Sequence, residues 1–77
     1  MEQTEFRRAK IAAEVRAELA RQKKTKTSLS QATGISPDTL RRRLDGVRPF
    51  YMDELDSITR FFGIPLVEFI SRTDVAA

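Results

Sequence analysis

The feature that most constrains this chain is a three-residue break, Gly34-Ile35-Ser36, between two short stretches patterned for helix. Glycine readily adopts the left-handed backbone conformation that ends a helix. Serine at the N-cap followed by proline, here Pro37, is a typical helix start. We therefore expect one helix to stop at Gly34 and the next to begin directly after Ser36. A turn this short sets the two helices at a steep angle and lets the second one protrude.

The segments before the break also carry helical patterns. Residues 4–22 are rich in helix-favouring Ala, Glu, Arg and Lys, and apolar residues recur there every four positions. The next helix is expected over residues 25–33, where Thr25 opens a weakened capping box. Leu29 and Ala32 should face inward from this helix.

Three helices are expected after the break. The first ends at Gly46, the second spans residues 53–62, and the third is a short helix opened by Pro65. Tyr51 lies where the second of these needs its cap and is a poor residue for that role. The predicted fold class is all-α, with five helices joined by short loops in one domain over residues 1–77. The other residues expected to face inward are Ile11, Val15, Leu19, Leu40, Leu44, Leu55, Ile58, Phe61, Phe62, Leu66, Phe69 and Ile70.

Several classes of function are disfavoured by what the composition lacks. The 77 residues include no cysteine and no histidine, which removes thiolate metal sites and the commonest general base. No nucleophile is spaced to a base, so we expect no enzymatic activity, and we expect no metal and no cofactor. The chain has neither an apolar run of about 18 residues nor the pattern of a signal peptide. These features predict a cytoplasmic protein without membrane association.

Positive charge is concentrated in the first two thirds of the chain. Residues 1–50 carry twelve Lys and Arg against six Asp and Glu, a balance of +6. Residues 51–77 carry two against five, a balance of −3, and the two parts together give the net charge of +3. A basic portion joined to an acidic one is a common footprint of a domain with one face for nucleic acid. A merely solvated surface of mixed charge is the alternative.

The stretch over residues 25–46, TKTSLSQATGISPDTLRRRLDG, resembles the helix-turn-helix of the lambda-repressor and Cro family. The resemblance implies a five-helix, lambda-repressor-like DNA-binding domain whose second and third helices form that motif. It also implies sequence-specific binding to the major groove of double-stranded DNA, with the second helix bridging the DNA backbone. The residues that carry the match are Leu29, Gly34, Ile35, Ser36, Leu40, Leu44 and Gly46, followed by Leu55, Ile58, Phe62, Gly63 and Ile64.

Candidate base-reading residues lie on the outer side of the third helix. With the core direction set between Leu40 and Leu44 and a step of about 100° per residue, Arg42 points almost directly away from the core. Asp38 lies beside it. The positions that read bases in the family, carried over residue by residue, fall on the same part of the helix. The candidate base-contacting residues are Arg42, Asp38, Pro37 and Thr39.

Each of these residues has a plainer interpretation as well. Arg42 is suited to a bidentate contact with guanine, or else it contacts a phosphate or remains solvated. Asp38 could accept a hydrogen bond from cytosine, or it could favour the helix dipole and pair with Arg42 four residues later. Pro37 has no side-chain donor and could at most touch a thymine methyl group.

Phosphate contacts are expected from two places, the start of the second helix and the basic flanks of the third. Helix N-termini favour anions because their backbone N–H groups are free and the helix dipole is positive there. The alternative for each residue is a solvated charge or a plain helix cap. The candidate phosphate-contacting residues are Thr25, Lys26, Thr27, Ser36, Arg41, Arg43 and Arg48.

The resemblance favours a transcriptional repressor of the Cro-like or phage-immunity type, acting in a bacterial cell or a phage-infected host. The chain ends soon after the fifth helix, which disfavours a two-domain repressor. The alternatives are a protein-interaction module and a partner-dependent regulator of the restriction-controller or antitoxin type on the same fold. Steep loss of affinity with salt would distinguish DNA binding from protein binding.

A homodimer on a palindromic site is the expected assembly. The expected dimer surface comes from the less basic C-terminal third of the chain. The alternative is that its residues simply complete a small core, and the tail after Arg72 is short and Ala-rich and could be disordered. The residues of this surface are Tyr51, Met52, Val67, Ile70 and Val75.

Overall fold

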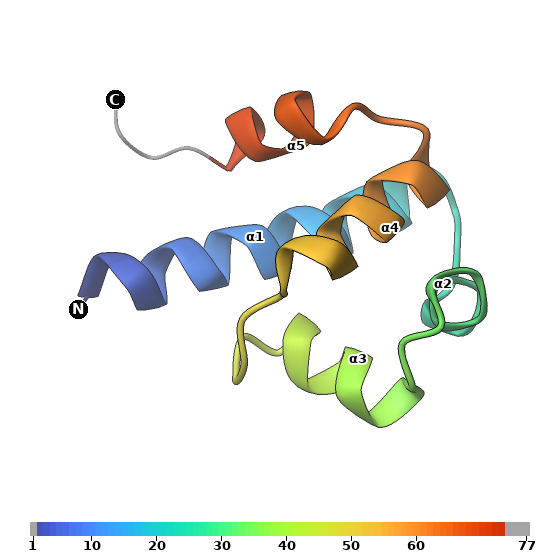
Figure 1. Cartoon of the computed structure of the whole chain (residues 1–77), viewed down its shortest axis with the longest axis horizontal. Helices are drawn as coiled ribbons and strands as arrows, with labels where there is room; N and C mark the ends of the chain where they lie inside the picture. Colours follow the sequence, from blue (N-terminus) through green and yellow to red (C-terminus); the bar gives the residue numbers. More distant parts are fainter. Residues whose placement is uncertain (1, 74–77) are drawn as a thin grey trace.

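The computed structural model describes residues 2–73, which form five α-helices and no strand (Figure 1). The predicted all-α fold is therefore confirmed, with small shifts at the helix ends. No helix within the described range is long and apolar enough to cross a membrane. The helices are α1 (Glu2–Arg21), α2 (Lys26–Thr33), α3 (Pro37–Leu44), α4 (Met52–Phe62) and α5 (Leu66–Arg72).

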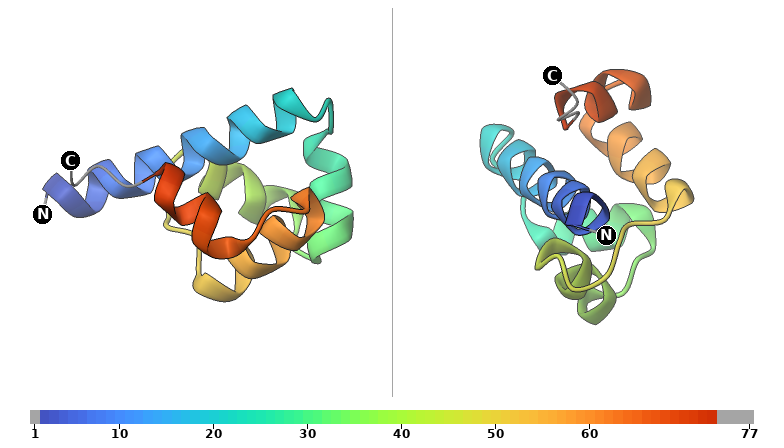
Figure 2. Two further views of the ribbon diagram at one scale, coloured as in Figure 1. Left: turned by 90° about the horizontal axis from the view of Figure 1, so that it is seen from above. Right: turned by 90° about the vertical axis from the view of Figure 1, so that its left-hand side faces the viewer.

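The helices are arranged in layers around α1, the longest of them. Seen nearly end-on in the right-hand view of Figure 2, α1 and α4 form the middle of the molecule. In Figure 1 and in the right-hand view of Figure 2, α5 lies on one side of this middle layer and α3 on the other. α2 packs against α3 and α4, α3 packs against α1, and α5 packs against α4. This arrangement leaves the outer side of α3 facing away from the rest of the protein.

One hydrophobic core joins all five helices. Ala32, which we expected to face inward, is exposed, and its neighbour Ser30 is buried instead. The Ser30 hydroxyl donates a hydrogen bond to the Ile35 carbonyl at 2.5 Å, which turns this side of α2 toward the core. At about 100° per residue, the inner arc then runs from Leu29 to Ser30 and excludes Ala32. The core cluster consists of Val15, Leu19, Leu29, Ile35, Leu40, Leu44, Leu55, Ile58, Phe62 and Phe69.

The break between α2 and α3 has the predicted geometry. Gly34 ends α2 in the left-handed conformation, with φ of 77°, and its N–H donates to the Ser30 carbonyl. Ser36 caps α3 by accepting a hydrogen bond from the Thr39 N–H, and Pro37 occupies the first helical position. α3 ends at Leu44, two residues before the expected Gly46.

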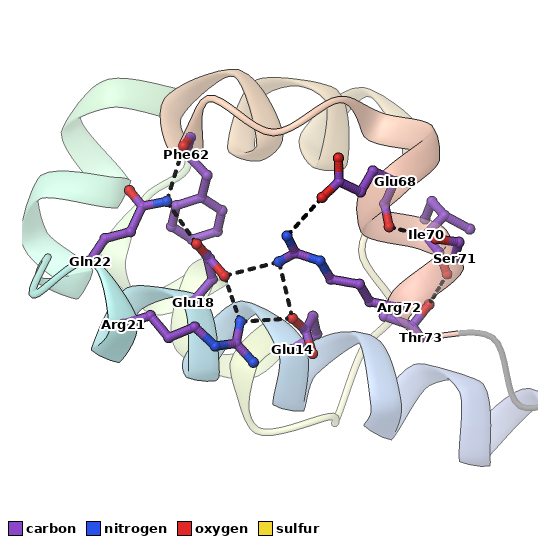
Figure 3. Close-up of polar contacts among 10 residues, drawn as sticks. All are labelled: Glu14, Glu18, Arg21, Gln22, Phe62, Glu68, Ile70, Ser71, Arg72 and Thr73. Atoms are coloured by element: carbon purple, nitrogen blue, oxygen red, sulfur yellow. Dashed lines mark hydrogen bonds and ion pairs between the residues drawn. The ribbon is translucent and has the colours of Figure 1, made fainter.

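α5 is attached to α1 by charged side chains (Figure 3). The core residue Phe69 also belongs to the cluster that joins the helices. The buried carboxylate of Glu18 accepts hydrogen bonds from Arg21, the last residue of α1, and from Gln22 directly after it, at 2.5 and 2.8 Å. It also accepts one from Arg72 of α5 at 3.0 Å. Arg72 pairs in addition with Glu68 of its own helix at 3.0 Å. The network fixes where α5 lies relative to the long helix.

Candidate nucleic-acid interface

The outer side of α3 carries the predicted base-reading residues. Pro37, Asp38 and Arg42 are exposed, whereas Leu40 and Leu44 on the opposite side are buried. The helical geometry expected from these two leucines is therefore present. The fourth predicted residue on this helix is partly buried, and its contacts are described below.

Arg42 and Asp38 do not pair with each other. Asp38 forms an ion pair with Arg41 instead, at 3.3 Å and three residues apart. Among the side chains of residues 7–73, Arg42 makes no ion pair and no side-chain hydrogen bond. Its guanidinium is therefore free to contact a ligand, and the charge of Asp38 is partly balanced by its neighbour on the same surface.

Thr39 and Ser36 are occupied with each other at the start of α3. The Ser36 hydroxyl accepts from the Thr39 N–H at 3.3 Å and donates to the Thr39 hydroxyl at 3.0 Å. Thr39 is half-buried as a result of its position. A base contact by Thr39 would have to share a hydroxyl that already takes part in the helix cap.

The start of α2 offers the arrangement expected of a phosphate site. Thr25 and Ser28 form the predicted capping box, in which the Thr25 hydroxyl accepts from the Ser28 N–H at 3.0 Å. The N–H groups of Lys26 and Thr27 precede the first intrahelical bond and have no acceptor within their own helix. Both residues are exposed. Two N–H donors and one lysine therefore face the solvent together.

The N-termini of α2 and α3 share one groove. It has a volume of about 400 Å³ and is lined by Lys26 and Thr27 from α2 and by Pro37, Asp38 and Arg41 from α3, above Leu40. The structure thus brings predicted phosphate-contacting and predicted base-contacting residues together. Arg48, in the segment between α3 and α4, is exposed but does not line this groove.

Arg43 is placed differently from the other predicted phosphate-contacting residues. Its guanidinium forms two hydrogen bonds with the carboxylate of Glu54 on α4, at 3.0 and 3.1 Å. The guanidinium carbon also lies 5.0 Å from the centre of the Tyr51 ring. Burial would raise the pKa of Glu54, but hydrogen bonds from Arg43 and from the Tyr51 N–H outweigh it and lower that pKa.

Sequence reasoning missed two residues that hold α3 in place. Glu54 accepts a hydrogen bond from the Tyr51 N–H at 2.9 Å, and so caps α4 where Tyr51 itself cannot. A glutamate three residues after a helix cap is a known sequence signal, and it could have indicated Glu54. Arg16 of α1 donates a hydrogen bond to the Leu44 carbonyl at the end of α3. No local pattern in the sequence points to that contact, because the two residues are 28 positions apart.

Comparison with known proteins gives one match. A model of the Cro/C1-type HTH DNA-binding domain family matches residues 14–74, which is more than half of the chain and includes α2, α3, α4 and α5. No curated protein and no solved structure matched the chain.

Proposed function

Because the chain belongs to the Cro/C1-type HTH DNA-binding domain family, we propose that it is a sequence-specific transcriptional repressor of the Cro-like or phage-immunity type. It reads the major groove of duplex DNA with α3. The observation that carries this proposal is the exposed Arg42, which has no partner among the described side chains, on the outer side of a helix whose inner side is fixed in the core. A guanidinium in that position can donate two parallel hydrogen bonds to the O6 and N7 atoms of guanine.

Base reading is then shared by a small set of residues. Arg42 supplies the main contact, and Asp38 accepts a hydrogen bond from cytosine. The ion pair of Asp38 with Arg41 limits the repulsion between the Asp38 carboxylate and the phosphates. Pro37 contacts a thymine methyl group. Thr39 contributes a weaker contact through a hydroxyl shared with the cap.

Phosphate binding orients α3 on the duplex. The free N–H groups of Lys26 and Thr27, next to the Thr25 cap, receive one phosphate at the positive end of α2. Ser36 and Arg41 contact the backbone on the other side of the groove that α2 and α3 share, and Arg48 extends the contacts beyond it.

A second copy of the chain binds on the side of α5. Tyr51, Met52 and Val67 are exposed, Val67 to 81%, which is unusual for large apolar side chains. Met52 and Val67 line an apolar groove of about 410 Å³ with Leu66, Ile70, Arg7 and Ser71. Val75, which we also predicted on this surface, lies outside the described residues. Pairing through this surface leaves both copies of α3 free for successive major grooves.

The proposal is tested by enriching binding sites from a random pool of duplex DNA at roughly 150 mM salt, a concentration at which phosphate contacts alone bind weakly. A palindrome with half-sites about one helical turn apart is the expected result. A single short site would leave base reading in place and contradict the homodimer. No enrichment would contradict sequence-specific binding and favour a protein partner for the same fold.

A further inference from the structure

The three consecutive arginines of α3 do not share one environment. The side chain of Arg41 is 60% exposed, whereas that of Arg43 is only 12% exposed. Arg42 lies between them and is exposed. A run of arginines on a DNA-reading helix suggests three contacts to DNA, yet the third one is turned into the protein.

The contact that Arg43 makes is specific in its geometry. Its Nε and Nη2 atoms donate separately to the two oxygens of Glu54, at 3.0 and 3.1 Å. One of these oxygens also accepts from the Tyr51 N–H at 2.9 Å, so the carboxylate is tied to the start of α4. A planar, bidentate pair fixes the relative orientation of the two groups, which a single ammonium contact would not.

The position of this pair matters for α3. The helix packs against α1 and α2, and Arg43 links its last turn to α4. Arg16 of α1 holds the Leu44 carbonyl at the same end. The C-terminal end of α3 is therefore held by two helices, in the same turn that carries Arg42. Adjacent helical residues differ by about 100°, so any roll of α3 that released Arg43 would also turn Arg42 away from its base.

We propose that Arg43 is a positioning residue for DNA reading rather than a phosphate contact. Together with Glu54 and Tyr51 it fixes the roll of α3, and so determines which bases Arg42 and Asp38 meet. This inference rests on the proposed function, since it assigns a role within base reading. It extends the interface to α4, which contributes the acidic residue Glu54 although the duplex itself is anionic.

The two interpretations of Arg43 predict opposite effects for Glu54→Gln. If Arg43 contacted phosphate, removing a nearby negative charge would leave DNA affinity unchanged or raise it. If Arg43 positions α3, the same change loosens the pair and lowers affinity for the specific site. Arg43→Lys supplies a second variant, because it keeps the positive charge but loses the bidentate geometry.

The experiment measures affinity for the enriched site and for an unrelated duplex over a series of salt concentrations. Asp53→Asn is the matched control, since it removes an exposed negative charge one residue before Glu54. Lys26→Ala shows the behaviour of a phosphate contact, which lowers the salt slope by about 1. Thermal unfolding of each variant establishes whether it is folded at the titration temperature. If Glu54→Gln is unfolded there, the affinities of Arg43→Lys test the role of Arg43.

We expect Glu54→Gln and Arg43→Lys each to reduce the ratio of specific to unrelated affinity by about tenfold, with the salt slope of wild type. Asp53→Asn should keep the wild-type ratio. The inference is overturned if both variants keep the wild-type ratio, or if Glu54→Gln binds both duplexes as tightly as Asp53→Asn does. A wild-type protein that does not discriminate between the duplexes would overturn the proposed function itself, and the role of Arg43 with it.

Discussion

Arg42 and Arg43 show how one helical step changes what the same side chain does. Arg42 lies on the outer side of α3 without a partner in the described part of the chain, and Arg43 is held by Glu54. The exposure of Arg42 could be predicted from Leu40 and Leu44, because helical periodicity defines the outer side once the inner side is known. The partner of Arg43 could not be predicted from the sequence, because Glu54 lies on another helix whose placement depends on tertiary packing.

Substitution of Arg42 tests base reading at the level of one side chain. We expect Arg42→Ala to lose about 1 to 3 kcal/mol of discrimination at a single base pair of the enriched site, because one bidentate contact is removed. Binding is measured against a set of sites that each differ from the enriched one at one position. Lys26→Ala is the comparison, and it should weaken binding to every member of the set about equally. Equal loss across the set for Arg42→Ala would mean that Arg42 meets a phosphate.

At the scale of helices, the local signals were reliable. Thr25 at the start of α2, Gly34 at its end and the Ser36–Pro37 start of α3 all have the predicted geometry. Each signal acts within four residues, so the surrounding fold has little opportunity to change it. Ala32 was the exception, because a hydrogen bond from its neighbour Ser30 to the next segment decided which side of α2 faces the core.

The attachment of α5 could not be predicted from the sequence. Glu18 is a charged residue in a helix that has an adequate apolar side without it, and nothing near it in sequence indicates burial. Its partner Arg72 is 54 positions away. Burial would raise the pKa of Glu18, but hydrogen bonds from Gln22 and Arg21 and the charges of Arg21 and Arg72 lower it below its ordinary value.

This lowered pKa predicts how stability depends on pH. A carboxyl group whose pKa is lower in the folded protein stabilises the fold above its unfolded pKa, about 4.3 for glutamate. That contribution is lost as pH falls through the folded pKa. We expect Glu18→Gln to reduce the free energy of unfolding by about 1 to 2 kcal/mol at pH 7, because charge-assisted hydrogen bonds are lost.

The measurement is chemical denaturation of both proteins at intervals from pH 7 to about pH 3, across the titration range of glutamate. The difference between wild type and Glu18→Gln should narrow below about pH 4.3 and be unchanged above about pH 5.5. Asp56→Asn serves as the control, since Asp56 is partly exposed and pairs with Arg60 outside this network. A difference that stays constant down to the lowest pH would rule out the ionised state of Glu18 as its source.

At the scale of the whole molecule, the helix of the proposed DNA-reading face and the α5 part of the proposed dimer surface are separated by the middle layer. α3 and α5 lie on opposite sides of α1 and α4 in Figure 1 and in the right-hand view of Figure 2. The all-α fold could be predicted from helical spacing and capping residues, and the family from the resemblance of residues 25–46 to a known helix-turn-helix. The groove shared by the starts of α2 and α3 could not be predicted, since its shape depends on how closely the two helices approach each other.

The dimer surface is tested by placing a charge on it. We expect Val67→Lys to raise the dissociation constant of the homodimer by about tenfold or more, because a charge would have to be buried at the centre of an apolar contact. Sedimentation at several protein concentrations measures this constant. Ala20→Lys adds the same charge at an exposed site that does not line the apolar groove, and it should leave the constant unchanged. A wild-type protein that sediments as a monomer throughout would contradict the homodimer directly.

The long-range contact between Glu18 and Arg72 has a consequence for the order in which the molecule is completed during synthesis. Chains emerge from the ribosome N-terminus first, at about 5 to 20 residues per second. α1 to α4 therefore become available before Arg72 does, and until then Glu18 has its nearby hydrogen-bond partners Arg21 and Gln22 but not Arg72. The helix-turn-helix is synthesised first, and the surface proposed for a second copy is complete only when α5 docks. The proposed pairing of two copies therefore cannot begin before α5 is made.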